Sequence, residues 1–472
     1  MKILTILKWL AVILFTLAGL APLTFVAINW ADEKLSPEGE ALLRAPESKV
    51  ADAANGYYVL LGMNAPADAN ALETGRKIQA ARDRLYREDP LRQNFDAPDL
   101  LPAVGTSPEL GFDKLRCPMQ GNNCVNRYLA QAPLVREQMR VHALSLARYG
   151  QMMQLPGYEE KPIPSPYAPL ANYQAVTRAA ELELAGAVLD VDAGRDAAGL
   201  AKIAAGIAYH RQLLAGSSGL LTRMISVSML RRELQVLSEL IERKPALAQS
   251  QRKLFQRLLA PLTPQENDLR PAIAVEARSL ATMLQLMPEM MKRQGGGKPG
   301  FMGGLSETWA ARFIYLPNAS INRLTPYWSA IAGLGHGSAA TYEQRKQQFA
   351  QSPTGQRKWS GGVEWNYVRN PMGKILAGIA LPEMGTYIER VHDLDGYIRL
   401  VSLQVAIRAE QVAPAAIGEF ADKAAPEMCD PYTGMPMGWD AASSSLWFVG
   451  HQRAPSNPVA EPKTYRVRLA AV

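Results

Sequence analysis

Side chains that could carry acid–base or metal chemistry are few and scattered in this sequence. Its five histidines are His142, His210, His336, His392 and His451. No two of them are four residues apart, and the metalloprotease pattern HExxH does not occur. The His-Asp-Leu-Asp run at 392–395 is the one His–carboxylate cluster, and it fits a general base or a weak metal site, with a solvated helix start as the alternative. No catalytic constellation emerges, and we expect neither a cofactor nor a metal site.

One segment, 301–378, departs from the average composition. It holds eight Lys or Arg residues against three acids, and eleven aromatic residues. Arg and Trp together are typical of binding hot spots and of surfaces that stack on sugars or contact anionic headgroups. The alternative is a region rich in loops that uses its aromatic residues for packing. The candidate binding surface consists of Arg312, Arg323, Trp328, Arg357, Lys358, Trp359 and Trp365.

Three cysteines indicate the redox environment. Cys117 and Cys124 flank the six-residue loop PMQGNN, whose Gly and Asn residues suit a tight turn. In an oxidising compartment this spacing predicts a local disulfide, with free thiols as the alternative. A metal site would need two more soft ligands nearby, and none is present. Cys429 is left over and could instead pair with either.

The most informative segment comes first in the chain. Residues 9–30 are 22 residues without a formal charge, which makes about 33 Å of helix, enough to cross a bilayer core of about 30 Å. Lys2 and Lys8 precede this run, whereas Asp32 and Glu33 follow it. The positive-inside rule therefore predicts a signal anchor with a cytoplasmic start and an exported body. A cleaved signal peptide is the alternative. We expect a single-pass bacterial inner-membrane protein with most of its chain in the periplasm.

Composition and periodicity predict a helical body. Lys plus Arg exceed Asp plus Glu by only 7 over 472 residues, so nothing in the charge indicates a nucleic-acid partner. Apolar residues recur at three- and four-residue steps from Leu220 to Ile241, before Pro245. Similar stripes cover 133–154, 166–191, 196–214, 246–260, 271–292 and 386–412. Short connections predict a multi-helix bundle or short solenoid, mainly α, with two short strands at 446–450 and 464–469.

This reading divides the chain into five parts. They are a cytoplasmic start and transmembrane anchor (1–30), a linker and irregular segment with the disulfide loop (31–125), a helical bundle (126–294), an aromatic-rich second helical part (295–425) and a small C-terminal β module (426–472). The glycine-rich run at 295–304 suggests the boundary between the two helical parts.

The C-terminal module resembles a recurring bacterial element. Cys429-Asp430-Pro431-Tyr432-Thr433-Gly434, followed by the run Leu446-Trp447-Phe448-Val449-Gly450, is similar to a D-P-[FY]-[ST]-G-x-P-[LM] turn with a short strand after it. The signatures NGYY (55–58), LPNAS (316–320) and NPMG (370–373) also resemble those of uncharacterised, membrane-anchored proteobacterial envelope proteins. The resemblance implies an envelope location and no known activity. In physical terms, Asp430 can cap the turn and Gly434 can supply a positive φ.

Two functions remain open at this point. The first is a non-enzymatic envelope protein that binds or scaffolds a periplasmic protein or the cell wall. The second is a periplasmic hydrolase that acts on lipid or peptidoglycan. Perturbed titratable groups clustered in a deep pocket would favour the enzyme, whereas a broad apolar and aromatic groove would favour binding.

Overall fold

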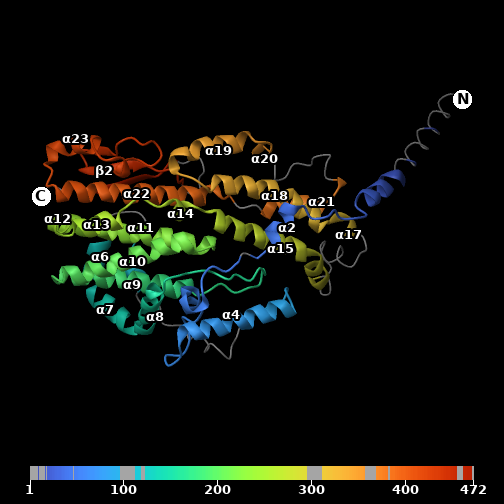
Figure 1. Cartoon of the computed structure of the whole chain (residues 1–472), viewed down its shortest axis with the longest axis horizontal. Helices are drawn as coiled ribbons and strands as arrows, with labels where there is room; N and C mark the ends of the chain where they lie inside the picture. Colours follow the sequence, from blue (N-terminus) through green and yellow to red (C-terminus); the bar gives the residue numbers. More distant parts are fainter. Residues whose placement is uncertain are drawn as a thin grey trace.

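The computed structural model shows a mainly helical protein with a small three-stranded sheet near its C-terminal end (Figure 1). The structure describes the chain except for residues 1–8, 10–15, 17–18, 46, 96–111, 118–122, 295–310, 357–367, 381–382, 454–460 and 470–472. The predicted fold class is confirmed at the level of helices and sheet. Within the described ranges, no helix is long and apolar enough to cross a membrane. The predicted span at 9–30 lies partly outside those ranges.

The first part of the chain forms several short helices and one longer helix, α4. They are α2 (Pro37–Leu43), α3 (Gly56–Leu61), α4 (Ala71–Glu88), α5 (Phe112–Leu115), α6 (Cys124–Ala130), α7 (Ala132–Val141) and α8 (Ala143–Gln154). The segment 31–125, expected as linker and irregular chain, thus contains α4. The side chain of Asn70 caps α4 by accepting the N–H of Glu73 at 3.2 Å. A Cβ on Gly75 would lie 1.7 Å from the Tyr58 carbonyl oxygen, so α4 packs on α3 through backbone. This glycine contact weakens the apolar stripe that would have predicted α4.

The central helices follow the predicted stripes closely. They are α9 (Tyr173–Asp192), α10 (Asp196–Gly216), α11 (Leu220–Arg243), α12 (Ala246–Ser250), α13 (Arg252–Leu258), α14 (Pro264–Asn267) and α15 (Arg270–Gln294). Two predicted helices are divided: 133–154 breaks at His142 and 246–260 breaks at Gln251. Gly219 is the N-cap of α11 and forms no side-chain cap bond. Thr263 and Glu266 form a capping box at α14.

The last part of the chain forms a long helix with a sheet packed on it. Its elements are α17 (Ala311–Ile314), α18 (Pro317–Leu334), α19 (Tyr342–Gln351), α20 (Pro353–Gln356), α21 (Pro371–Ala380), α22 (Gly385–Ala409), α23 (Ile417–Asp422), β1 (Gly438–Asp440), β2 (Ser445–Val449) and β3 (Thr464–Arg468). The strands form an antiparallel meander in the order β1-β2-β3, with Leu446 opposite Val467. Strands β2 and β3 both contact α22. The two predicted strands are therefore present, with β1 in addition.

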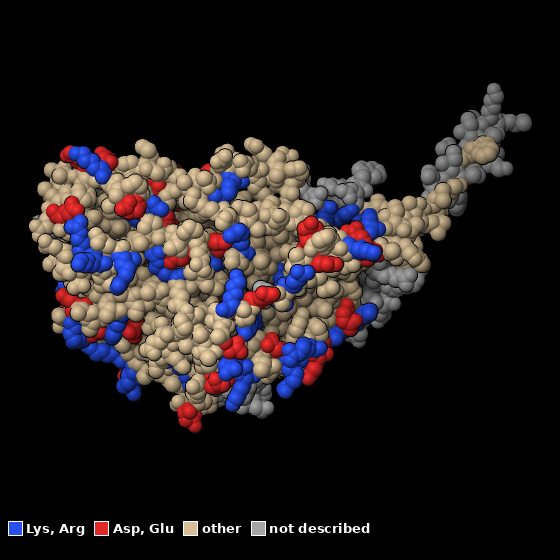
Figure 2. Space-filling view, in the orientation of Figure 1, with Lys and Arg blue, Asp and Glu red and all other residues tan. Residues whose placement is uncertain are grey.

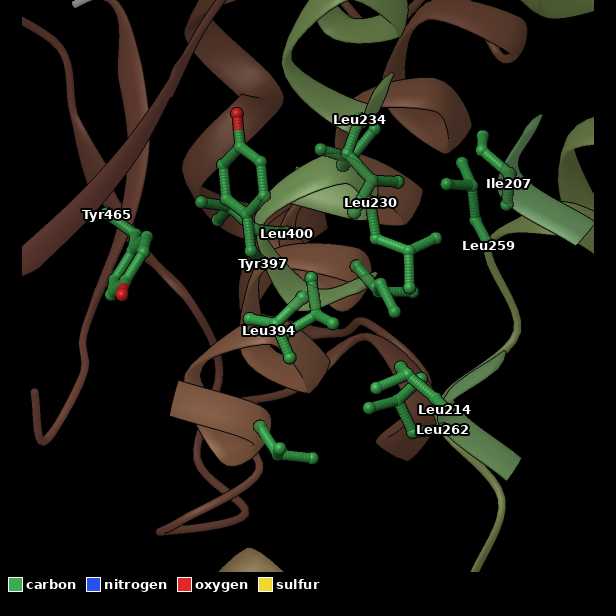
Figure 3. Close-up of a cluster of buried hydrophobic side chains, with 14 of the residues drawn as sticks. Ile207, Leu214, Leu230, Leu234, Leu259, Leu262, Leu394, Tyr397, Leu400 and Tyr465 are labelled. Atoms are coloured by element: carbon green, nitrogen blue, oxygen red, sulfur yellow. The ribbon is translucent and has the colours of Figure 1, made fainter. Parts of the chain in front are cut away.

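One hydrophobic core joins the helices of the middle and the end of the chain. It contains buried residues from Leu115 to Leu469. Leu230 and Leu234 of α11 face Leu394 and Leu400 of α22, and α10 packs on the other side of α11 (Figure 3). A second cluster lies around α3, α8 and α9. The ranges predicted as separate helical parts, 126–294 and 295–425, contribute to the same core.

The predicted disulfide is present in the structure. Cys117 and Cys124 are bonded, with their Cα atoms 5.3 Å apart, and both are buried. Glu239 of α11 accepts the backbone N–H of Cys124 at 3.1 Å and that of Val125 at 2.7 Å. A carboxylate thus caps the start of α6 just behind the bridge. Cys429 is a free, buried thiol, so it pairs with neither.

Replacing Cys117 and Cys124 together by alanine should lower the free energy of unfolding by roughly 2–3 kcal/mol, because the open loop gains entropy in the unfolded chain. Denaturant titrations of wild type and variant measure this loss. Reductant should lower the stability of wild type but not that of the variant. Peptide mapping without reductant should recover the two cysteines in one linked fragment. If both thiols are alkylated in protein taken directly from cells, the bridge does not form.

Candidate functional site

A cavity of about 230 Å³ opens where α4, the start of α11, α15 and the irregular segment 155–172 meet. Helix α4 contributes Gln79 and Arg82 to its wall, and α15 contributes Glu276 and Ser279. The rim is apolar and exposed to solvent. The exposed fraction of the Leu170 side chain, for example, is 76%. The wall therefore combines hydrogen-bonding groups with an apolar rim, the composition that small-molecule sites share.

The segment that carries the key acid is held by the NGYY signature. Asn55 is fully buried, and its side-chain amide donates to the Glu159 carbonyl oxygen at 2.8 Å. Its side-chain oxygen accepts the Glu159 N–H at 2.9 Å, and the Gly56 N–H donates to the Gly157 oxygen at 2.9 Å. These bonds align residues 157–159 beside α3 as in a short parallel bridge. Glu160 consequently projects into the wall of the cavity from a fixed backbone.

Glu160 is a buried carboxyl group at the wall of the cavity. Its Oε1 accepts hydrogen bonds from the hydroxyls of Tyr173, at 2.9 Å, and Thr222. A Cβ on Gly219 would lie 2.1 Å from Oε2, so the start of α11 approaches the Glu160 carboxyl group closely at this glycine. Burial raises the pKa of Glu160, and the two hydroxyl hydrogen bonds oppose this only in part. Glu160 therefore keeps its proton to a higher pH than a solvated glutamate does.

The other charges of the cavity are partly neutralised. Burial, with a smaller contribution from Glu160, raises the pKa of Glu276 across the cavity. Lys161 forms an ion pair with Asp52 at 2.8 Å and lies over the ring of Tyr58. Its ammonium is thus committed to the neighbouring loop. The cavity therefore presents two acids with raised pKa values, and cations lie beside them. Among its described residues, it does not present an acid–base pair of opposite charge.

Buried polar atoms without partners gather behind this wall. Arg223 of α11 is fully buried, and its Nε donates to the Ser217 carbonyl oxygen at 3.0 Å. Neither of its two amino groups has a hydrogen-bond partner among the described residues. Burial lowers the pKa of Arg223 to about 10. A buried guanidinium with unpaired amino groups is costly, so Arg223 is a strained element behind this wall.

A second, smaller cavity continues the line of polar groups into the core. It measures about 20 Å³ and shares Tyr173 with the larger one, and Thr222 lines it as well. On its far side His210 Nδ1 lies 2.9 Å from Oε1 of Glu233, and both residues are buried. Burial also raises the pKa of Glu233. Titratable groups with shifted pKa values therefore extend from the larger cavity into the space between α10 and α11. Such groups are typical of functional sites.

The His-Asp-Leu-Asp cluster lies inside α22, so the expectation of a solvated helix start is wrong. Asp393 accepts hydrogen bonds from the hydroxyls of Tyr432, at 2.6 Å, and Tyr465, at 3.0 Å. It also accepts the backbone N–H of His451 at 2.8 Å. Burial lowers the pKa of His392 to about 3, so its ring is neutral. Across the described residues, no group of three or more His, Cys, Asp or Glu side chains could hold a metal ion. The cluster fastens the C-terminal module to α22.

The turn of the C-terminal module has the predicted geometry. Asp430 Oδ1 accepts the N–H of Tyr432 at 2.8 Å, and the Asp430 carbonyl oxygen accepts the N–H of Gly434 at 2.8 Å. Gly434 has φ +70°. The turn directs the Tyr432 hydroxyl to Asp393, which shows a structural use for the motif.

The predicted binding surface of 301–378 is only partly described. Trp328 lies on α18 and is 3% exposed, packed in the core. Arg323 is half-buried on the same helix, and Arg312 lies in α17. The remaining members, Arg357, Lys358, Trp359 and Trp365, lie outside the described residues. Trp328 is thus the tryptophan of this surface that the structure describes. It is buried, so it acts in packing.

Replacing Trp328 by alanine should destabilise the protein by about 3–5 kcal/mol, because a buried indole leaves a large cavity in the core. The matched control is Leu170→Ala, which removes an exposed apolar side chain and should change the stability by no more than about 0.5 kcal/mol. Thermal and denaturant unfolding measure both. A Trp328→Ala variant that unfolds with wild-type stability would show that this residue does not support the core.

The pKa of Glu160 predicts a pH-dependent stability difference. Between the ordinary carboxyl value of 4.5 and the raised folded-state value, folding takes up a proton at this site, so its contribution to stability falls as the pH rises. Glu160→Gln keeps an oxygen acceptor and cannot ionise. The variant should therefore gain stability relative to wild type as the pH increases above about 4.5.

Denaturant midpoints across this pH range measure the difference. Glu88→Gln, at an exposed position near the end of α4, is the matched control and should show no such trend. A Glu160→Gln difference that is constant with pH would contradict the burial of an acid that favours its neutral form.

Comparisons with known proteins supply no relative for this chain. No protein-family model matches it. No curated protein and no solved structure matches it either. The functional argument therefore depends on the geometry of the chain itself.

Proposed function

We propose that the chain is a single-span bacterial inner-membrane protein whose helical body lies in the periplasm and binds a protein or cell-wall ligand without catalysing a reaction. We group it with the membrane-anchored envelope proteins that its C-terminal module resembles. The supporting observations concern the start of the chain, the disulfide and the cavity.

The single observation that carries the membrane anchor is an apolar helix with most of its described side chains exposed. Residues 19–28 are helical and project away from the body (Figure 1). Leu20 is 52% exposed, Leu23 67% and Trp30 63%. The described stretch of the projecting part shows neither Lys and Arg nor Asp and Glu, whereas both signs of charge are interspersed over the body (Figure 2). Exposed large apolar side chains in a row are costly in water and are stabilised by lipid.

Charge and cysteine chemistry support a periplasmic body. Lys2 and Lys8 lie before the apolar run and Asp32 and Glu33 after it, which favours export of the following chain. The Cys117–Cys124 bond fits an oxidising compartment.

The cavity supports binding more directly than catalysis. It combines an apolar rim with hydroxyl, amide and carboxyl groups, which suits reversible recognition of a small group on a ligand. Ser165, one of its hydroxyls, donates to the Pro90 carbonyl oxygen at 3.0 Å rather than to a general base. Lys161 is engaged by Asp52.

A hydrolase is the second candidate, and Glu160 is the observation that favours it. A buried carboxylic acid that keeps its proton can act as a general acid in glycoside cleavage. Incubating the full-length protein with purified cell-wall sacculi separates the two candidates. A binding protein should sediment with the sacculi and release no soluble fragments. Release of fragments by wild type and not by Glu160→Gln would favour the hydrolase.

Topology provides the test of the anchor. Alkaline phosphatase fused after Ser48 should be active, because the enzyme acquires its disulfides only outside the cytoplasm. A fluorescent protein that matures only in the cytoplasm, fused at the same residue, should stay dark. An inactive phosphatase fusion beside a bright fluorescent fusion would place the body in the cytoplasm and overturn the proposal.

A further inference from the structure

We propose that residues 368–378, which comprise most of α21 and the turn before it, lie on the surface of the lipid bilayer into which the N-terminal apolar segment inserts. This inference rests on the proposed anchor and adds a second, peripheral contact between the body and the membrane.

The first step is the position of α21 relative to the end of the apolar segment. Asn29 is fully buried, and its side chain donates to the Val368 carbonyl oxygen at 2.8 Å and accepts the Asn370 N–H at 2.8 Å. Arg369 donates to the Ile28 carbonyl oxygen at 2.5 Å. α21 begins at Pro371. Its first turn is therefore fixed at the level where the apolar run ends, which is the interface if that run spans the bilayer.

A second set of bonds prevents the body from swinging about this joint. Asp32 caps α18 from outside the helix: it accepts the N–H of Asn318 at 2.7 Å and that of Ala319 at 3.1 Å. Asn322 donates to Glu33 at 2.8 Å, and its oxygen accepts the Ser36 N–H at 2.8 Å. The chain after the apolar segment is thus bound to α18 over two turns, and α18 packs against α21. The orientation of α21 relative to the anchor is set by these contacts.

The third step is the chemistry of the exposed face of α21. Gly373 and Ala377 are buried and face the body, and a Cβ on Gly373 would lie 2.1 Å from the Ser320 hydroxyl oxygen. The opposite side exposes Ile375 by 46%, and Val368 just before the helix is exposed by 44%. The ten residues of α21 include one charge, Lys374, and no acid. An apolar face with a cationic flank is the composition of helices that lie in the membrane interface.

The continuity of this face with the anchor identifies lipid as the occupant. Ile28 and Trp30 are exposed at the base of the projecting helix, by 39% and 63%. Three hydrogen bonds join this base to the turn before α21. Asn29 donates to the Val368 carbonyl oxygen and accepts the Asn370 N–H, and Arg369 donates to the Ile28 carbonyl oxygen. In Figure 1, α21 lies at the end of the body from which the N-terminal helix emerges. A protein partner or a second copy would have to displace the bilayer from the same level, so lipid is the partner to which the proposal commits.

The test measures contact with lipid at three positions of the full-length protein in vesicles of phosphatidylethanolamine and phosphatidylglycerol. Ile375→Cys, Leu23→Cys and Val141→Cys carry a fluorescent label, each in a Cys429→Ala background. Leu23 reports the anchor, and Val141, 47% exposed on α7, is the matched apolar control on the body. Circular dichroism confirms that each labelled protein is folded.

Quenching by lipids with a nitroxide near the headgroup should be several-fold stronger at Ile375 than at Val141. Quenching at Leu23 should be strongest with a nitroxide deep in the acyl chain. If Leu23 is quenched and Ile375 behaves as Val141 does, the interfacial contact is wrong while the anchor stands. If Leu23 is not quenched, the anchor itself is wrong. If the Ile375 label is shielded from water but not quenched by lipid, a protein covers this face and the proposal fails.

Discussion

The buried side-chain amide of Gln404 joins helix α22 to helix α11 and to strand β3. Gln404 of α22 donates to the Ser238 carbonyl oxygen of α11 at 3.4 Å, to Glu242 of α11 at 3.1 Å and to the Arg468 carbonyl oxygen of β3 at 2.9 Å. Arg408, one turn further along α22, forms an ion pair with the same Glu242 at 2.6 Å. A buried amide left unpaired costs about 1–3 kcal/mol, so these bonds favour one register of α22 against both neighbours. The leucines of Figure 3 supply the burial, but they would tolerate a sliding of the helices that the polar contacts do not.

Glu181 shows how the body accommodates a buried carboxylate by pairing it, and it differs in this from Glu160 at the cavity. Glu181 of α9 accepts the Tyr128 hydroxyl at 2.5 Å and the Cys117 N–H at 3.1 Å, and it forms an ion pair with Arg232 of α11. Such a pair repays the cost of removing two charges from water only because every acceptor is used. At the cavity, Glu160 is also buried but faces no cation in an ion pair among the described residues, and burial raises its pKa. The two carboxylates therefore differ in how their burial is compensated, and this difference agrees with the proposed binding role of the cavity.

Local periodicity predicted the helices that bury one continuous stripe, and it failed where tertiary contacts replace the stripe. Helices α11, α15 and α22 have apolar residues at three- and four-residue steps, so their bounds were predicted to within a few residues. The sequence pattern did not predict α4, because Gly75 contacts α3 through backbone and not through an apolar side chain. The disulfide was predictable because both cysteines are close in sequence. Glu160 was not, since its burial depends on Tyr173 and on Gly219 of α11, which no local pattern connects with it.

The signatures that distinguish this sequence turn out to share a physical role. LPNAS and NPMG meet at the joint with the N-terminal segment, where Asn370 donates to the Ser320 hydroxyl at 2.9 Å and accepts the Leu316 N–H at 2.9 Å. NGYY holds the segment that carries Glu160, and the C-terminal turn places Tyr432 on Asp393. Each is a short polar motif that satisfies backbone groups of a distant segment, a task that needs particular side chains at particular positions. A search for function that begins with such motifs therefore leads to the joints of the molecule. The cavity adjoins one of these joints, since Tyr57 of NGYY lines its wall, but Glu160 itself belongs to none of the motifs.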